Sequence, residues 1–378
     1  MKPPWSHARA PIAALVDDAV SQGLGSAVAL AVWTPERAWY HCAGRTKRYR
    51  RDGQGTLLPD PGLPIGPTTA FDLASLTKPL VTSTLIAQDL SSRTAGYDLD
   101  TPLDRLWAPS RNTPLAELTV SSLIGHGSGL PAWHDFYQQA CEQPDRAKEI
   151  QRLVLATPLA TPPGTQAVYS DLGFLLLGWM LEAVHGQPLD RLYQQRIAKP
   201  LSIHSGFRPL PQQLPFDAIV ATEIWPPRCS DGRPLQGAVH DDNSAGLNGI
   251  SGHAGLFGSV VDVVTQAQSW LRAAQEKPAD RLGLDPDVVQ AWLQTAAAPS
   301  TTWRLGWDTP SRPGSTAGDS VPETTFGHLG FTGTSLWICP ARSAIAVLLS
   351  NRVHPDRAEV QGIRALRRSV HDAIWLSL

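Results

Sequence analysis

A serine and a lysine three positions apart are the residues whose spacing most directly suggests chemistry. The stretch Ser75-Leu-Thr-Lys78 opens residues 75–90, which we predict to be a helix with Pro79 in its first turn, where a missing N–H costs little. At i and i+3 the hydroxyl and the amine lie on one helix face and can touch. The N-terminus of a helix favours an alkoxide and disfavours an ammonium, so a partly desolvated Lys78 can act as a neutral base for Ser75.

The plainer interpretation is that Ser75 only caps the helix and that Lys78 is solvated. Of the six lysines in the chain, however, only Lys78 has a serine three residues before it. Rival catalytic motifs are missing from the sequence. No Gly-x-Ser-x-Gly elbow occurs, and the nearest imitation, at residues 125–129, has its serine one place off. Neither a His-Glu-x-x-His zinc motif nor a phosphate-binding glycine loop with lysine is present.

The segments around this pair occur in a recognisable order. Phe-Asp-Leu-Ala-Ser-Leu-Thr-Lys at 71–78 resembles the SxxK motif of the superfamily of serine β-lactamases, penicillin-binding proteins and family VIII esterases. Residues 118–131 resemble the segment that leads into that superfamily's helical domain. Tyr-Ser-Asp at 169–171 takes the place of its Tyr-x-Asn motif, and Gly-His-Leu-Gly-Phe-Thr-Gly at 327–333 takes the place of Lys-Thr-Gly on the edge strand. The resemblance runs from about residue 26 to the end of the chain.

Each match implies a role. The resemblance makes Tyr169 the second base, which shuttles the proton of the nucleophile, although a core tyrosine is the alternative. It also implies an oxyanion hole formed by the backbone N–H groups of Ser75 and Phe331, beside Gly330. Such donors matter because negative charge develops there only as the tetrahedral intermediate forms.

Two positions depart from the family pattern. Asp171 replaces an asparagine that would donate to a substrate amide, and an ionised carboxylate cannot donate. Asp171 could instead pair with Lys78 and raise the lysine pKa, or recognise a substrate ammonium or hydroxyl group. His328 replaces the lysine that helps to hold the substrate carboxylate in β-lactamases, and a neutral imidazole weakens that recognition. Both changes argue against an efficient β-lactamase.

A further segment carries several polar residues. Ala-Val-His-Asp-Asp-Asn at 238–243 is followed by Gly-His-Ala-Gly-Leu-Phe-Gly at 252–258, similar to a penicillin-binding-protein-like subgroup in which some members cleave cell-wall peptide fragments. His240, Asp241 and His253 could suggest a metal, but their spacing fits no standard zinc site. The alternatives are a contact of His240 with substrate and a hydrogen-bonded loop that orders the wall of the site. We expect no metal and no cofactor.

The elements that must position these residues follow from the hydrophobic pattern and the turn signals. Expected strands lie at 26–34, 37–44, 333–338 and 343–349, and expected helices at 146–155, 171–185, 189–198 and 360–375. The last helix looks amphipathic, with Arg364, Arg367 and Arg368 expected on its outer side.

Strands at both ends with helices between them predict an α+β fold of the β-lactamase/transpeptidase type. We expect an antiparallel sheet flanked by the terminal helices, an all-helical domain, and the active site in the cleft between them. The expected boundaries are residues 1–85 and 245–378 for the discontinuous α/β domain and 86–244 for the helical domain.

Composition limits the possible partners. The chain has 378 residues, 42% of them hydrophobic and 17% charged, and a formal net charge of −2. This balance gives no global field toward nucleic acid or an anionic membrane. No secretory signal pattern or membrane span is visible, so a chain that starts at residue 1 is expected in the cytoplasm.

Three functions remain open from the sequence. The first is an esterase or amidase that acts on a small ester, amide or peptide, including cell-wall peptide fragments, through a Ser75 acyl-enzyme. The second is a β-lactamase or D-alanyl carboxypeptidase, which the replacement at position 328 disfavours. The third is a non-catalytic binding module on the same fold, which has no need of the set Ser75, Lys78 and Tyr169.

Overall fold

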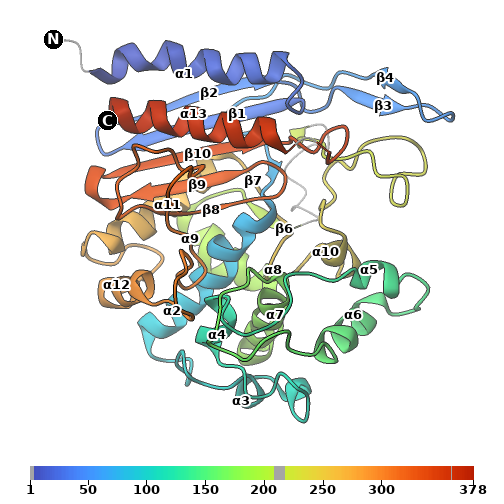
Figure 1. Ribbon diagram of the computed structural model, residues 1–378, viewed down its shortest axis with the longest axis vertical. Helices are drawn as coiled ribbons and strands as arrows, with labels where there is room; N and C mark the ends of the chain where they lie inside the picture. Colours follow the sequence, from blue (N-terminus) through green and yellow to red (C-terminus); the bar gives the residue numbers. More distant parts are fainter. Residues whose placement is uncertain (1–3, 208–217, 359) are drawn as a thin grey trace.

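The computed structural model describes residues 4–207, 218–358 and 360–378 (Figure 1). At its centre is a five-stranded antiparallel sheet with the strand order β2-β1-β10-β9-β8. The strands are β1 (Ala27–Thr34), β2 (Arg37–Gly44), β8 (Phe326–Leu329), β9 (Ser335–Cys339) and β10 (Ala344–Ser350). β1 pairs with β10, so the sheet joins the two ends of the chain. The predicted strands near both ends of the chain are therefore confirmed.

Helices cover both faces of the sheet. α1 (Pro4–Ser21) and α13 (Gln361–Ser377) lie along one face, while α11 (Val260–Ala274) lies against the other (Figure 1). Side chains alternate along β1 as a strand requires. Val28, Leu30 and Val32 pack with α1 and α13, whereas the alanines between them face the larger core on the α11 side. The arrangement confirms the predicted antiparallel sheet flanked by the terminal helices.

The amphipathic C-terminal helix is confirmed, but the expectation for one of its arginines is wrong. Arg364 and Arg368 are exposed, whereas Arg367 is only 6% exposed and points inward. Its position four residues after the buried Ile363 puts it on the inner face of α13. The guanidinium donates to the carbonyls of Gly330 and Thr334, which compensates for its burial.

The other half of the molecule is mainly helical and lies below the sheet in Figure 1. Its helices are α2 (Thr84–Ser92), α3 (Leu103–Leu106), α4 (Val120–Ile124), α5 (Phe136–Gln139), α6 (Arg146–Leu155), α7 (Asp171–His185), α8 (Leu189–Tyr193), α9 (Lys199–Leu201) and α10 (Asp242–Gly246). α12 (Pro286–Gln294) packs against α11 and α2. The predicted helices at 146–155 and 171–185 coincide with α6 and α7, and the one at 189–198 is α8 extended by a π-helical turn.

The helix predicted over residues 75–90 has three differently wound parts. A 3₁₀ turn at Ala74–Leu76 is followed by a π-helical turn at Lys78–Ser83, and α2 begins only at Thr84. Helical turns of the π type are rare and often occur at functional sites. Proline at the second π-helical position has no N–H to contribute, in agreement with the expectation that it belongs to a first turn.

Two small sheets accompany the main one. β5 (Phe71–Asp72), β7 (Leu256–Gly258) and β6 (Gly206–Phe207) form one, and β3 (Tyr49–Arg51) pairs with β4 (Leu57–Pro59). One cluster of buried hydrophobic residues extends from β1 through the helical half to α8. Because the two halves share this core, the domain boundaries expected from the sequence stay a prediction. None of the described helices is both long and apolar enough to cross a bilayer.

Candidate active site

The turn that carries Ser75 is held by a buried carboxylate. Ser75 follows Ala74, whose φ of 49° lies in the left-handed region that residues with a Cβ seldom adopt. Asp72, on β5, accepts the backbone N–H of Ala74 at 2.9 Å and that of His240 at 2.6 Å. These two bonds support a strained backbone directly before the serine, which is partly exposed.

Lys78 is fully buried beside the serine. Its Nζ lies 3.0 Å from Ser75 Oγ, 2.6 Å from Asp171 Oδ1 and 3.3 Å from the carbonyl oxygen of His253. Burial acts to lower the pKa of Lys78, but Asp171 and Tyr169 outweigh it, so the pKa lies above its usual value. Of the two states considered from the sequence, the geometry favours the ion pair with Asp171 over a neutral amine.

Tyr169 stands over the serine–lysine pair. The Lys78 Nζ lies 4.8 Å from the centre of the tyrosine ring, and the phenol is near enough to Lys78 and Ser75 for both to influence its pKa. Burial raises the pKa of Tyr169, and the nearby ammonium only partly opposes this, so the phenol is neutral at ordinary pH. The structure thus brings together the three residues to which the sequence assigned catalysis.

Two aromatic residues hold the tyrosine ring in place. His126 and Trp303 pack on Tyr169 with ring centres 4.8 and 5.0 Å away. The backbone N–H of Ser170 donates to His126 Nδ1, and burial keeps the pKa of His126 well below its usual value, so the proton of this neutral ring is on Nε2.

Asp171 lies at the junction of two charged pairs. It is the first residue of α7, where a negative charge is favoured by the helix dipole. Asp241 accepts from His253 Nε2 at 2.9 Å, and the two carboxylates and His253 place ligand atoms within 4.8 Å of one another. That geometry could hold a cation. The Lys78 ammonium already supplies a positive charge to Asp171, so a metal ion would have to compete with it.

His328, on the edge strand β8, is buried and neutral. Its Nδ1 donates to the carbonyl of Leu329 at 2.7 Å, because a carbonyl oxygen can only accept. Burial, helped by the charge of Lys78, lowers the pKa of His328 to about 3. Its Nε2 is therefore an acceptor, and it has no hydrogen-bond partner among the described residues. The His328 ring lies 5.9 Å from that of Tyr169.

The loop after β8 is fastened to the turn that carries the nucleophile. Thr332 and Thr334 donate through their hydroxyls to the carbonyls of Asp72 and Leu73. A side chain at Gly330 would lie 2.9 Å from the Leu73 carbonyl oxygen, so this close approach requires glycine.

The same loop carries Phe331. Within the described parts of the chain, the backbone N–H groups of Ser75 and Phe331 have no hydrogen-bond acceptor. Both donors are thus available for a developing oxyanion, the role that the sequence resemblance implied.

His240 lies in the wall of the site and is not bonded to Ser75, Lys78 or Tyr169. Its Nε2 is 3.0 Å from Glu223, a carboxylate whose pKa His240 and Arg357 hold at about 2 despite burial. Its ring stacks on Phe331 with centres 5.6 Å apart. This matches the interpretation of the segment as a hydrogen-bonded loop that orders the wall. His240 is also absent from the set of residues that could hold a cation.

Several residues of the site were not predicted from the sequence. Trp303 packs against Tyr169 and Arg367 donates to the Gly330 carbonyl, yet neither belongs to a recognisable motif. Asp72 lies within the motif at 71–78, but no role was assigned to it from the sequence. His126 does lie in the segment 118–131 that was singled out. Its place in that segment is the one signal that could have marked it as a residue of the site.

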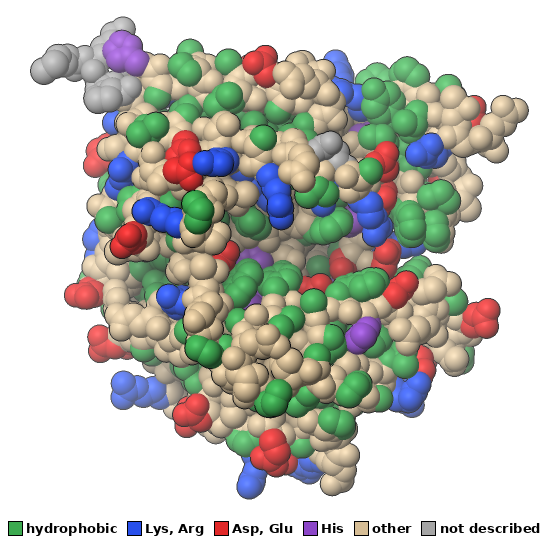
Figure 2. Space-filling model, in the orientation of Figure 1, with side chains coloured by type: hydrophobic (Ala, Val, Ile, Leu, Met, Phe, Trp, Pro, Cys, Tyr) green, Lys and Arg blue, Asp and Glu red, His purple; other side chains and the backbone are tan. Residues whose placement is uncertain are grey.

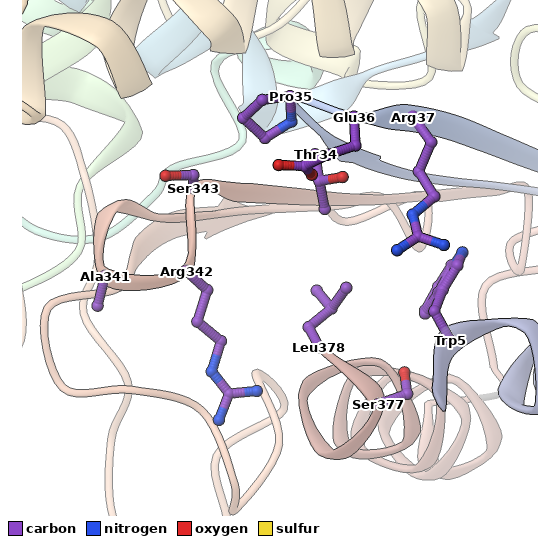
Figure 3. A pocket seen from close by; sticks show the side chains of 10 residues that line it. All are labelled: Trp5, Thr34, Pro35, Glu36, Arg37, Ala341, Arg342, Ser343, Ser377 and Leu378. Atoms are coloured by element: carbon purple, nitrogen blue, oxygen red, sulfur yellow. The ribbon is translucent and has the colours of Figure 1, made fainter. Parts of the chain in front are cut away.

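Figure 2 shows the surface hollowed between the sheet half and the helical half, with hydrophobic and acidic side chains along the hollow. Two further cavities lie elsewhere. One, of about 340 Å³, is lined by residues that include Arg37, Arg342 and Leu378, and both arginine side chains border it (Figure 3). The other, of about 470 Å³, lies at Asp89 and His185. Neither contains a predicted site residue.

Comparison with known proteins places the chain in a family. The model of the family described as Beta-lactamase matches residues 12–370. A protein of Escherichia coli (strain K12) named "Putative D-alanyl-D-alanine carboxypeptidase" is 30% identical over 352 residues, covering 86% of this chain and 77% of that one. The "N-acetylmuramyl-L-alanine amidase" of Bacillus subtilis (strain 168) is 31% identical over 316 residues, covering 76% and 68%.

Solved structures agree on the fold. "EstCE1, a hydrolase with promiscuous acyltransferase activity" superposes with a TM-score of 0.73 at 18% identity, covering 98% of this chain and 99% of the other. "Crystal structure of SurE with D-Leu" gives 0.70 at 24% identity, covering 97% and 76%. The chain belongs to the β-lactamase family, with its α+β fold. It is a serine hydrolase.

Proposed function

We propose that this enzyme cleaves a small ester or amide, including amides of cell-wall peptide fragments, through an acyl-enzyme on Ser75. The observation that carries the proposal is the contact of Ser75 Oγ with Lys78 Nζ at 3.0 Å, with the Tyr169 ring centre 4.8 Å from the same Nζ. A nucleophile in hydrogen-bond reach of its partner, which a third group orients in turn, is the arrangement that covalent catalysis requires.

The proton leaves Ser75 through the Lys78–Asp171 pair. Lys78 is already an ammonium, so it can take the serine proton only by giving one of its own to Asp171, 2.6 Å away. The serine oxygen then bonds to the substrate carbonyl carbon, and the oxyanion accepts from the backbone N–H groups of Ser75 and Phe331. The Lys78–Asp171 pair thus accepts the serine proton, the role that the sequence assigned to a neutral lysine.

Tyr169 supplies the proton to the leaving group. Because burial keeps its phenol protonated, Tyr169 can donate when the carbonyl–heteroatom bond breaks, and Lys78 and Asp171 return a proton to it. Water then attacks the acyl-enzyme on Ser75, and its proton leaves by the same groups. The products are an acid and an alcohol or amine.

His328 favours this activity over cleavage next to a carboxylate. A carboxypeptidase or β-lactamase substrate presents a carboxylate, which needs donors or a positive charge, whereas His328 Nε2 offers a buried lone pair. Of the activities named for the two curated relatives, the amidase activity of the Bacillus subtilis protein therefore fits this site better than the carboxypeptidase activity named for the Escherichia coli protein.

A panel of four substrates tests the proposal: a short-chain nitrophenyl ester, a D-amino-acid amide, a muropeptide and a chromogenic cephalosporin. We expect turnover of the ester or of one of the amides, at a rate above that of the cephalosporin. Ser75→Ala should abolish this turnover, while Ser92→Ala, at the exposed end of the same helical run, should retain it. Silence on all four substrates would favour the non-catalytic binding module.

A further inference from the structure

Two aromatic side chains near the site are exposed to solvent. Among the Phe, Trp and Tyr residues in the described parts of the chain, Trp133 at 48% and Phe331 at 51% are the exposed ones. Large apolar side chains left in water beside a reacting group are typical of surfaces that bind a ligand. Trp133 belongs to the helical half and Phe331 to the loop after β8.

The exposed ring of Phe331 is held in place. It stacks on His240 at an interplanar angle of 23°, and the Arg352 guanidinium lies 4.5 Å from its centre. Arg352 Nε also donates to the carbonyl of Phe331 at 2.9 Å. The contacts with His240 and Arg352 therefore hold this exposed ring in place. Phe331 is also the residue whose backbone N–H was assigned to the oxyanion hole.

Trp133 lies on a loop fastened on both sides. The Asp171 N–H donates to the carbonyl of Ala132 at 2.9 Å, and the buried Asn243 side chain donates to the carbonyl of His134 at 2.8 Å. The first of these bonds ties the loop directly to the partner of Lys78. A tryptophan fixed at its backbone and exposed at its ring loses little conformational entropy when a ligand covers it.

We propose that Trp133 and Phe331 are specificity-determining residues, which select substrates with a flat, uncharged ring next to the scissile bond. This rests on the proposed hydrolysis at Ser75. An aromatic ring and a sugar ring both have a flat apolar face, and either face can stack on an exposed aromatic side chain. Neither aromatic face carries a formal charge, so the ring that it selects needs none either.

The test compares ring-bearing with ring-free substrates that have the same reacting bond. Ethyl acetate has no ring, ethyl phenylacetate has one in the acyl part, and benzyl acetate has one in the leaving group. We expect the wild type to prefer at least one ring-bearing ester in kcat/KM, and Trp133→Ala or Phe331→Ala to reduce that preference by about tenfold, the scale of one apolar contact. Trp133→Phe and Phe331→Tyr should retain it. Leu63→Ala, a change at another exposed apolar residue, is the matched control.

Binding separates this inference from the proposed function. In the Ser75→Ala protein, NMR titration compares N-ethylacetamide, N-benzylacetamide and methyl N-acetylglucosaminide, which represent no ring, an aromatic ring and a sugar ring. We expect tighter binding of one ring-bearing ligand, weakened by Trp133→Ala or Phe331→Ala. A wild type without esterase activity but with this preference would contradict only the proposed function. Equal binding of all three ligands, or a preference that survives both substitutions, would overturn the role of the two aromatic residues.

Discussion

Each end of α7 forms a close side-chain contact with the helical run that follows Ser75, and the two contacts differ in how their hydrogen bonds are used. At the first residue of α7, Asp171 lies 2.6 Å from Lys78. At the last, His185 lies 2.9 Å from Asp89, which also binds Arg196 at 2.7 Å. The same two segments are therefore joined by close side-chain contacts at both ends.

The cluster around Asp89, at the far end of α7, bonds only to other parts of the fold. Asp89 is buried, and its two side-chain oxygens accept from Arg196, from His185 and from the Tyr97 hydroxyl at 2.8 Å. All of these bonds are made between elements of the fold. A buried carboxylate bonded in this way holds helices together, and none of its partners is a group that reacts.

In the Lys78–Asp171 pair, by contrast, one hydrogen bond goes to a group that takes part in the reaction. Lys78 directs one N–H to the Ser75 hydroxyl, a group that must change its own bonding during catalysis. Asp171 keeps part of its side chain open to the cleft. The comparison indicates that what distinguishes a catalytic ion pair from a structural one is a bond to a group that reacts, since both pairs are buried and close.

The strongest way to break the comparison is to remove the groups that surround the serine proton. Lys78→Ala and Tyr169→Phe should each lower kcat by about 10²–10⁴-fold with a smaller effect on KM, because proton transfer contributes mainly in the transition state. Steady-state kinetics on the best ester or amide of the panel measures both. A Tyr169→Phe enzyme within about threefold of the wild-type kcat, well below that range, would reduce Tyr169 to a packing residue.

The two departures from the family pattern can be reversed together. Asp171→Asn with His328→Lys should raise the ratio of kcat/KM for a cephalosporin to that for a neutral ester by about 10 to 150-fold, the scale of one hydrogen bond to a charged group. The asparagine restores an amide donor and the lysine a positive charge for the substrate carboxylate. The asparagine also removes the proton acceptor of Lys78, so both rates should fall and only their ratio is compared. If the ratio does not change, these positions do not set specificity. A wild type that already prefers the cephalosporin would count against the esterase or amidase activity itself.

The cluster around Asp89 should affect stability and leave catalysis alone. Asp89→Asn removes the charge that binds Arg196 and His185, and we expect a loss of about 1–3 kcal/mol in the free energy of unfolding. Urea denaturation measures this loss, and kcat should stay within about threefold, below the range of a lost catalytic group. Asp319→Asn, which breaks an exposed pair with Arg368, is the matched control, and its stability should change much less. A large fall in kcat for Asp89→Asn would mean that the two ends of α7 do not differ as argued.

The smallest expected effect concerns pH. Burial lowers the pKa of His328 to about 3, so this ring gains a proton only when the pH falls toward that value and stays neutral from pH 5 to 8. The ratio of cephalosporin to ester kcat/KM should therefore be flat over this range. A histidine that titrated near 6.5 would instead increase the relative rate of the carboxylate-bearing substrate as the pH falls through that value. Such an increase, lost in His328→Gln, would contradict the buried, neutral state.

The sequence predicts the local features of this molecule better than its contacts between distant residues. α7 begins at Asp171 and ends before Gly186, whose φ of 62° suits glycine, and both ends were predicted from local signals. The loop after β8 was identified by its motif. Arg367 was placed wrongly, because an arginine on an amphipathic helix is usually exposed and its carbonyl partners lie more than thirty residues away.

The charge state beside Ser75 could not be settled from spacing alone. The Lys78–Asp171 contact joins residues 93 positions apart, and the Asp72–His240 bond joins residues 168 apart. The sequence allowed both a neutral lysine and a paired one. Only the distance between the two side chains decides between these states, and no local pattern contains that distance.

The identity of the nucleophile is the central claim, and labelling tests it most directly. The protein is treated with a serine-directed phosphonate, and intact mass followed by peptide mapping locates the adduct. We expect one adduct, on Ser75, and none in a folded Ser75→Ala protein that has also lost turnover. An adduct on any other residue, or turnover that survives Ser75→Ala, would contradict the account.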